Sequence, residues 1–227
     1  MYDITLTSPG ALCYYADSFS AEPVRAGDWV GSVAEGGSVN HRQVRFTPHG
    51  TGTHTECYGH ISPDPDATLD KCLTQFAFAG KLLTVAPSQL GDDKVITLAS
   101  VEASLPAPGD AKAVIFRTLP NDPAKQTRNY SGTNPPYLEP ALAERLVALG
   151  IEHLLVDLPS VDPEVDGGKL LFHKAFWQTE GPAPLRRNAT ITELVFVPDH
   201  VPDGAYTVYI APAKWVLDAA PSRVWLA

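Results

Sequence analysis

Three of the seven histidines in the chain lie within the twelve residues from His49 to His60. The same stretch, TPHGTGTHTECYGHI, also contains Glu56 and several glycines. Neutral imidazole nitrogens and carboxylate oxygens are ligands that zinc and similar divalent ions take in proteins. On an extended segment His54 and Glu56 would share one face, because side chains alternate along a strand. The spacing therefore predicts part of a metal site.

One segment does not complete such a site. Catalytic zinc sites usually have three protein ligands and leave one position for water, so a further ligand must come from a distant part of the chain. Cys57 follows Glu56 directly and would point to the opposite face of a strand. We interpret Cys57 as a small buried thiol.

Alternating strands and helices could position these residues. Leucines at helical spacing, with Pro140 near the start and Gly150 after the end, predict a helix within residues 137–150. Strands on either side of it would make a βαβ unit with parallel strands. β-Branched and aromatic patterns predict strands at 38–47, 81–86, 111–119, 151–157, 190–197 and 205–211, a short helix at 98–105, and an edge strand at 222–227. The expected fold class is α/β, a mixed β-sheet with flanking helices in one domain over 1–227.

Composition argues against several classes of partner. A net charge of −9 and a pI near 5.1 are atypical of nucleic-acid binders. No apolar run approaches the roughly 20 residues of a membrane span, and no secretory signal pattern opens the chain. Three widely spaced cysteines are typical of a reducing compartment. We expect a cytoplasmic protein that acts on a small molecule, without nucleic-acid or membrane partners.

The histidine cluster resembles a motif of the cyclase family of metal-dependent hydrolases, which includes the bacterial kynurenine formamidases. That motif is HxGTHxDxPxH, and it is matched here by Gly52, Thr53, His54, Glu56 and His60, with Glu in place of Asp at 56 and Tyr58 in place of Pro. The resemblance continues in matching order over most of the chain, at LLVDLPSVDP (154–163), at His173, at ITEL (191–194) and at VPDGAYTVYIAPAKW (201–215).

The resemblance implies roles for individual residues. His54, Glu56, His173 and Glu193 would hold one or two ions, Zn or Mn, and a carboxylate could bridge two of them. His60 would donate and accept the proton, although it could also ligate an ion. A divalent ion lowers the pKa of bound water from 15.7 to about 7 and polarises a carbonyl. The implied reaction is hydrolysis of a C–N amide bond in a formamide or a cyclic amide.

The resemblance also implies a swivelling β/β/α-like fold and a homodimer or homotetramer. Two other functions stay open on the sequence alone. One is a cyclase or lactam hydrolase that forms or opens a ring, and the other is a metal-poor binding protein without catalysis.

Two departures from the family pattern bear on the site. The first histidine of the motif corresponds to Gly50, and His49 stands one residue earlier. His49 can replace it only if the segment 50–52 bulges, and otherwise a single ion is expected. In PVRAGD (23–28), Arg25 stands where the family has an aromatic residue that contacts substrate. A cation there suggests a substrate carboxylate, and the alternative is a surface arginine in a turn.

Polar residues after the strand at 151–157 are interpreted as structural. Asp157, Ser160 and Asp162 are predicted to be turn formers, because no GxSxG elbow surrounds Ser160. His153 is predicted to be structural or exposed.

Overall fold

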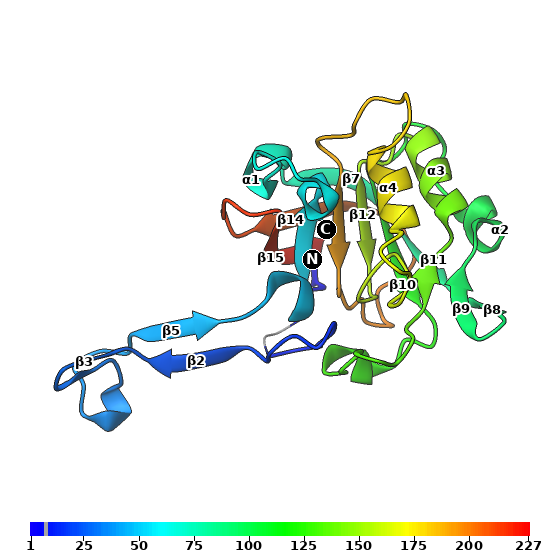
Figure 1. Cartoon of the computed structure of the whole chain (residues 1–227). Helices are drawn as coiled ribbons and strands as arrows, with labels where there is room; N and C mark the ends of the chain where they lie inside the picture. Colours follow the sequence, from blue (N-terminus) through cyan, green and yellow to red (C-terminus); the bar gives the residue numbers. More distant parts are fainter. Residues whose placement is uncertain (7–8) are drawn as a thin grey trace.

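A closed sheet of seven strands forms the centre of the molecule (Figure 1). The computed structural model describes residues 1–6 and 9–227. The strands follow the order β15, β14, β7, β10, β12, β13 and β6, and β6 pairs back with β15, while β1 is added outside β15. Their bounds are β1 (Tyr2–Asp3), β6 (His54–Cys57), β7 (Ala77–Val85), β10 (Ala113–Thr118), β12 (His153–Val156), β13 (Thr190–Glu193), β14 (Gly204–Pro212) and β15 (Ala219–Leu226).

Four neighbouring strands of this sheet, β7, β10, β12 and β13, run parallel. Strands β10 and β12 are buried along their whole length, as expected of parallel strands that are covered on both faces. Helices α3 (Pro140–Ala148) and α4 (Leu171–Trp177) pack against each other on one side of the sheet (Figure 1). Because α3 connects β10 to β12, the predicted βαβ unit with parallel strands is confirmed.

Helix α4 has a large apolar surface against the core. Phe172, Phe176 and Trp177 are completely buried, and the indole nitrogen of Trp177 donates to the carbonyl of Ala189. Burying a large side chain of this kind stabilises a fold by roughly 1.5–3 kcal/mol. The helix is therefore fixed firmly enough to position the one polar residue that it buries, His173.

Smaller elements surround the closed sheet. A three-stranded sheet joins β8 (Ser88–Leu90), β9 (Asp93–Ile96) and β11 (Tyr137–Leu138). Residues 20–45, which we call the arm, form a hairpin that projects from the body (Figure 1). The arm contains β2 (Ser20–Pro23), β3 (Arg25–Ala26), β4 (Trp29–Val30) and β5 (Arg42–Arg45). The remaining elements are α1 (Leu69–Cys72), α2 (Leu98–Val101) and 3₁₀ turns at Val33–Glu35, Pro48–Gly50, Tyr58–Ile61, Glu102–Ser104 and Pro123–Gln126.

The predicted fold class, a mixed sheet with flanking helices, is confirmed, with two differences in the strands. The strand predicted at 38–47 is present only over Arg42–Arg45, and it lies in the arm. The segment predicted as an edge strand at 222–227 belongs to β15, which pairs with β1, β14 and β6 and therefore closes the sheet. None of the helices among the described residues has the length and apolar character needed to span a bilayer.

Candidate metal centre

Strand β6 presents His54 and Glu56 on the same face of the sheet, as its two-residue alternation requires. In the antiparallel pairing of β6 with β13, His54 lies directly opposite Glu193. Residues directly opposite each other share one side of such a pair. His54 Nε2 accordingly lies 3.3 Å from Glu193 Oε2. Two of the predicted ligands are thus brought together by strand register alone.

His173 reaches the same place from helix α4. Its Nε2 lies 3.1 Å from Glu56 Oε1, and its Nδ1 lies 2.6 Å from Asp162 Oδ2. Asp162 also accepts hydrogen bonds from the backbone N–H groups of Phe172 and His173, at the first turn of the helix. A carboxylate behind a histidine in this way fixes the tautomer and the ring orientation. Asp162 therefore does more than form a turn, and its spacing from His173 in the sequence gave no signal of that role.

His49 faces the site although it stands one residue before the motif position. Its Nδ1 lies 3.0 Å from Glu56 Oε2, and its Nε2 lies 2.8 Å from Asp218 Oδ2. Residues Pro48–Gly50 form a 3₁₀ turn rather than a strand. A Cβ at position 50 would lie 2.2 Å from the Cβ of Ala16, so position 50 has no room for a side chain. His49 therefore approaches the site from a 3₁₀ turn at 48–50, and not through the bulge at 50–52 that the sequence pattern required.

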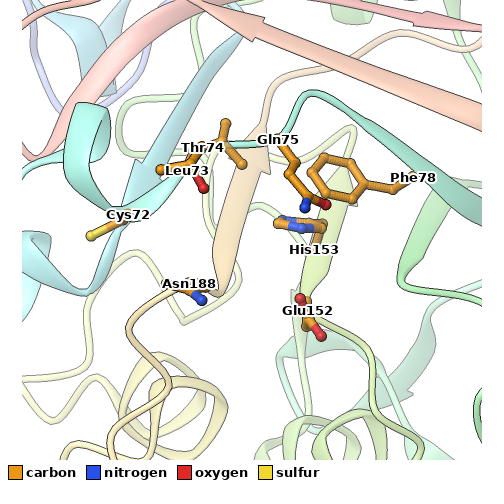
Figure 2. A pocket seen from close by; sticks show the side chains of 8 residues that line it. All are labelled: Cys72, Leu73, Thr74, Gln75, Phe78, Glu152, His153 and Asn188. Carbon is orange, nitrogen blue, oxygen red and sulfur yellow. The ribbon is translucent and has the colours of Figure 1, made fainter.

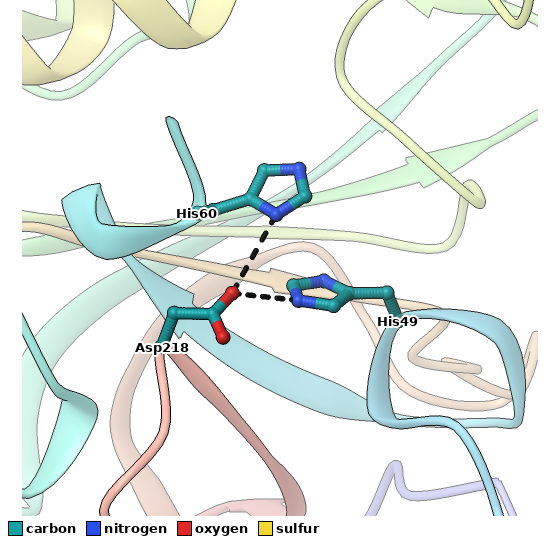
Figure 3. Close-up of side chains that lie close together, drawn as sticks. All are labelled: His49, His60 and Asp218. Carbon is teal, nitrogen blue, oxygen red and sulfur yellow. Dashed lines mark hydrogen bonds and ion pairs between the residues drawn. The ribbon is translucent and has the colours of Figure 1, made fainter. Parts of the chain in front are cut away.

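His60 and Asp218 form the outer side of the cluster (Figure 3). His60 Nδ1 lies 3.6 Å from Asp218 Oδ2 and 3.7 Å from Glu56 Oε2. The second ring nitrogen of His60 points away from Asp218 (Figure 3). A Cβ at Gly59 would lie 1.9 Å from the carbonyl oxygen of Ala67, so only glycine permits the turn that directs His60 here. Asp218 was not predicted, because nothing in the sequence links it to residues 49–60.

Burial and the neighbouring charged side chains shift the pKa values of this cluster in opposite directions. Burial raises the pKa of Glu56, but the neighbouring histidines, His60 first, lower that pKa well below its usual range. Burial lowers the pKa of His173, yet hydrogen bonds to Asp162 and Glu56 raise it to about 10. Hydrogen bonds from His49 and His60 hold the pKa of Asp218 far below its usual range. The cluster thus strongly favours positive charge, as a cation site must.

His54 gives the most specific indication of a metal. Its Nδ1 lies 3.0 Å from the carbonyl oxygen of Gly52, which can only accept a hydrogen bond, so Nδ1 carries the proton. Nε2 then offers a lone pair, is buried, and has no hydrogen-bond partner among the described residues. It faces a second acceptor, Glu193 Oε2, and a cation between the two would satisfy both. The residues present therefore fit a divalent ion.

Several groups of side chains could hold such an ion, each with ligand atoms within 4.8 Å of one another. Two of the groups share Glu56. One is His49, His54 and Glu56, the second is Glu56, His60 and His173, and a third combines His49, His60 and Asp218. Glu193 joins the cluster through His54, and its other oxygen accepts a hydrogen bond from the backbone of Val161.

A cavity of about 320 Å³ opens beside this cluster, and His49, His60, His173 and Glu193 are part of its wall. This volume lies in the usual range of small-molecule sites. Tyr14 also lines the cavity, and its hydroxyl can donate a hydrogen bond there.

Arg25 lies elsewhere in the chain. It belongs to β3, at the far end of the arm (Figure 1), and forms an ion pair with Glu35. It is not among the residues that line the cavity. The predicted contact of Arg25 with substrate stays a prediction.

A second cavity, of about 130 Å³, contains Cys72 and His153 but lacks the features of a reactive site (Figure 2). His153 is buried, its Nδ1 lies 2.9 Å from Thr190 Oγ1, and its ring packs against Phe78. Burial lowers the pKa of His153 to about 4, so the ring is neutral at physiological pH. These contacts agree with the structural role predicted for His153.

Comparison with known families agrees with the motif. A family model described as "Putative cyclase" matches residues 2–163, which is well over half of the chain. The chain belongs to the Cyclase family. The matched range includes His49, His54, Glu56, His60 and Asp162, whereas His173, Glu193 and Asp218 lie beyond it.

Curated relatives of this Cyclase-family chain include two kynurenine formamidases. The protein of Geobacillus thermodenitrificans is 28% identical over 195 residues, which span 85% of this chain and 82% of that protein. The protein of Bacillus anthracis is 26% identical over 193 residues, with the same shares.

Solved structures show the same fold at lower identity. A protein of Bacillus stearothermophilus described as a predicted metal-dependent hydrolase superposes with a TM-score of 0.69 at 19% identity, covering 99% of this chain and 96% of the other. Isatin hydrolase A from Labrenzia aggregata, bound to benzyl benzoate, gives a TM-score of 0.63 at 18% identity, covering 92% and 82%.

Proposed function

We propose that this protein is a metal-dependent hydrolase that cleaves a C–N amide bond of a small molecule. The observation that carries the proposal is the position of Glu56. Its two oxygens face His173 and His49 separately, and both histidines line a cavity large enough for a substrate. The kynurenine formamidases among its relatives support the same reaction class.

We assign the metal ligands to His54, Glu56, His173 and Glu193, with His49 as a further ligand. Two of the candidate groups share Glu56, so the residues present would hold one or two ions, and Glu56 would be a ligand in either case. Nitrogen and oxygen ligands without a thiolate suit Zn or Mn. When bound, such an ion lowers the pKa of water and polarises the carbonyl that is attacked.

His60 is the residue that we assign to proton transfer. Its Nδ1 faces Asp218 and Glu56, which favours a proton on that nitrogen and leaves Nε2 to exchange one with the substrate. A histidine in this position can protonate the leaving nitrogen as the amide bond breaks. Tyr14, on the same cavity wall, can donate a hydrogen bond to the substrate.

Two classes of substrate fit this chemistry, aryl formamides and cyclic amides of the isatin type. Formamides are suggested by the kynurenine formamidases, and cyclic amides by the fold shared with isatin hydrolase. We further infer a cytoplasmic enzyme that has no nucleic-acid partner, in line with its net charge of −9.

A hydrolysis screen tests the proposal. Metal-free protein, refilled with Zn or Mn, is assayed on an N-formyl arylamine, on isatin and on a cyclic imide. We expect hydrolysis of at least one, and His60→Gln should turn it over more slowly by roughly two to four orders of magnitude, since the proton donor is lost. His200→Gln, which changes an exposed histidine, is the matched control and should be fully active.

Three results would contradict the proposal in different ways. Equal turnover rates in His60→Gln and the control would exclude His60 as the proton carrier. Formation of a ring without hydrolysis would indicate a cyclase. Ligand binding without bound metal and without turnover would indicate a binding protein.

A further inference from the structure

A further cavity, of about 280 Å³, lies between helix α1 and the turn that joins β14 to β15. It shares none of its lining residues with the cavity beside the metal centre. The backbone N–H of Leu69, at the start of α1, donates to the carbonyl oxygen of Leu217 in the turn at 2.7 Å. The N–H of Ile210 in β14 donates to the carbonyl oxygen of Phe76 at 3.0 Å. These bonds fix one side of the cavity to the other, and a preformed site loses little entropy when a ligand binds.

Most residues that line this cavity are apolar. Leu69 and Leu73 are buried, and Pro212 and Ala213 face them from the other side of the cavity. The ring of Phe76 is 51% exposed. An apolar group in the cavity would cover that ring and remove apolar surface from water. An apolar wall with a small number of polar groups is typical of a site for a small molecule.

Asp70 supplies a negative charge on this wall. Its Oδ1 is buried and has no hydrogen-bond partner in residues 1–6 and 9–227. Lys71, the adjacent cation in the sequence, forms its ion pair with Asp66 instead. A carboxylate that is unpaired and only partly hydrated is stabilised by a cation that approaches it from the cavity. Asp70 therefore indicates an ammonium group in the ligand.

Lys214 supplies a positive charge on the side of the turn. Its side chain is exposed, and the lysines that form ion pairs in the described part of the chain are others. Asp70 and Lys214 line one cavity but do not pair with each other. A ligand that carries both an ammonium and a carboxylate could therefore pair with each of them.

The apolar wall and the two separate charges describe one class of ligand. We propose that this cavity binds a free α-amino acid with an aromatic side chain. The ammonium group pairs with Asp70, the carboxylate pairs with Lys214, and the aromatic ring packs between Leu73 and Phe76. This binding does not depend on the proposed hydrolysis, because the metal centre contributes no residue to the site.

Nuclear magnetic resonance of ¹⁵N-labelled, Zn-loaded protein tests the proposal, with L-phenylalanine as the probe. The amide signals of residues 69–76 and 213–214 should shift and saturate as the probe is added. Phenethylamine lacks the carboxylate and 3-phenylpropionate lacks the ammonium, so each should bind at least tenfold more weakly. Shifts confined to the surroundings of His49 and His60, or equal affinity for the three probes, would overturn the proposal.

Two variants assign the charges to residues. Asp70→Asn keeps the shape of the side chain but removes its negative charge, and Lys214→Gln removes the positive charge. Each should raise the Kd for L-phenylalanine at least tenfold. Asp66→Asn makes the same chemical change as Asp70→Asn outside the cavity and should bind as the wild type does. An unchanged Kd in either cavity variant would contradict the proposed contacts.

Discussion

Glu56 and His49 both depart from the family motif, and in the structure they contact each other. Glu56 is one methylene longer than aspartate, and its Oε2 lies 3.0 Å from His49 Nδ1. Its other oxygen reaches His173 at 3.1 Å. We interpret the longer carboxylate and the shifted histidine as compensating changes that keep both contacts of one acidic residue.

Asp162 is predicted to determine metal affinity without ligating the ion itself. It receives the Nδ1 hydrogen bond of His173, so Asp162→Asn should favour the wrong tautomer of that ring. We expect the metal Kd to rise roughly 10–100-fold. Competition with a chromogenic chelator measures the change. Asp17→Asn, at an exposed site, should bind metal as the wild type does, and an equal Kd in the two variants would exclude a positioning role.

His153 makes stability depend on pH. Its pKa is about 4 in the folded protein because of burial, against 6.5 when unfolded. Between these values the unfolded chain binds the extra proton, so the free energy of unfolding is full above pH 6.5 and falls as the pH approaches 4. The loss attributable to this residue is up to roughly 3 kcal/mol.

His153→Gln keeps a group that can bond Thr190 but does not titrate. Urea unfolding of chelated wild type and variant at pH 7 and pH 4.5 isolates this contribution, since other titrating groups are common to both. The wild type should lose more stability than the variant over this interval. Identical losses would show that His153 is already protonated in the fold.

At the scale of elements, the 3₁₀ turn Pro48–Gly50 determines where His49 points. Gly50→Ala would place a methyl 2.2 Å from the Cβ of Ala16 and should destabilise the protein by about 1–3 kcal/mol. It should also weaken metal binding, because the turn must shift. Ala16→Gly combined with Gly50→Ala removes the clash and should recover most of both losses. No recovery in the double variant, by thermal unfolding and metal titration, would contradict this explanation.

The elements differ in how well the sequence predicts them. Strands β10 and β12 and helix α3 were predicted because local periodicity determines them. The prediction that residues 222–227 form an edge strand was wrong. They belong to β15, and its pairing with β6 joins residues more than 160 positions apart, which local sequence patterns do not reveal. The loop 120–137 does not line the cavity. Lys125 within it is buried and bonds Asp157 at 2.9 Å, so Asp157 anchors this loop.

Only the resemblance to the family assigned residues that lie far apart in the sequence to one site. Composition alone could not link them. His173 and Glu193 were named from family segments, and the structure brings them next to Glu56 and His54. Asp162 and Asp218 were missed because their roles depend on tertiary contacts with His173, His49 and His60. The separation of the arm from the body was also missed, since its strands look like any others in the sequence.

We predict that amide hydrolysis requires the ions held by ligands from distant parts of the chain, His54 and Glu56 together with His173 and Glu193. The most direct measurement is the hydrolysis rate during titration of metal-free protein with Zn or Mn. The rate should rise from near zero in proportion to added metal and level off at one or two equivalents, while Glu193→Gln stays inactive up to the same point. Full activity before any metal is added, or a hydrolysis rate that does not change as metal is added, would contradict metal-dependent hydrolysis.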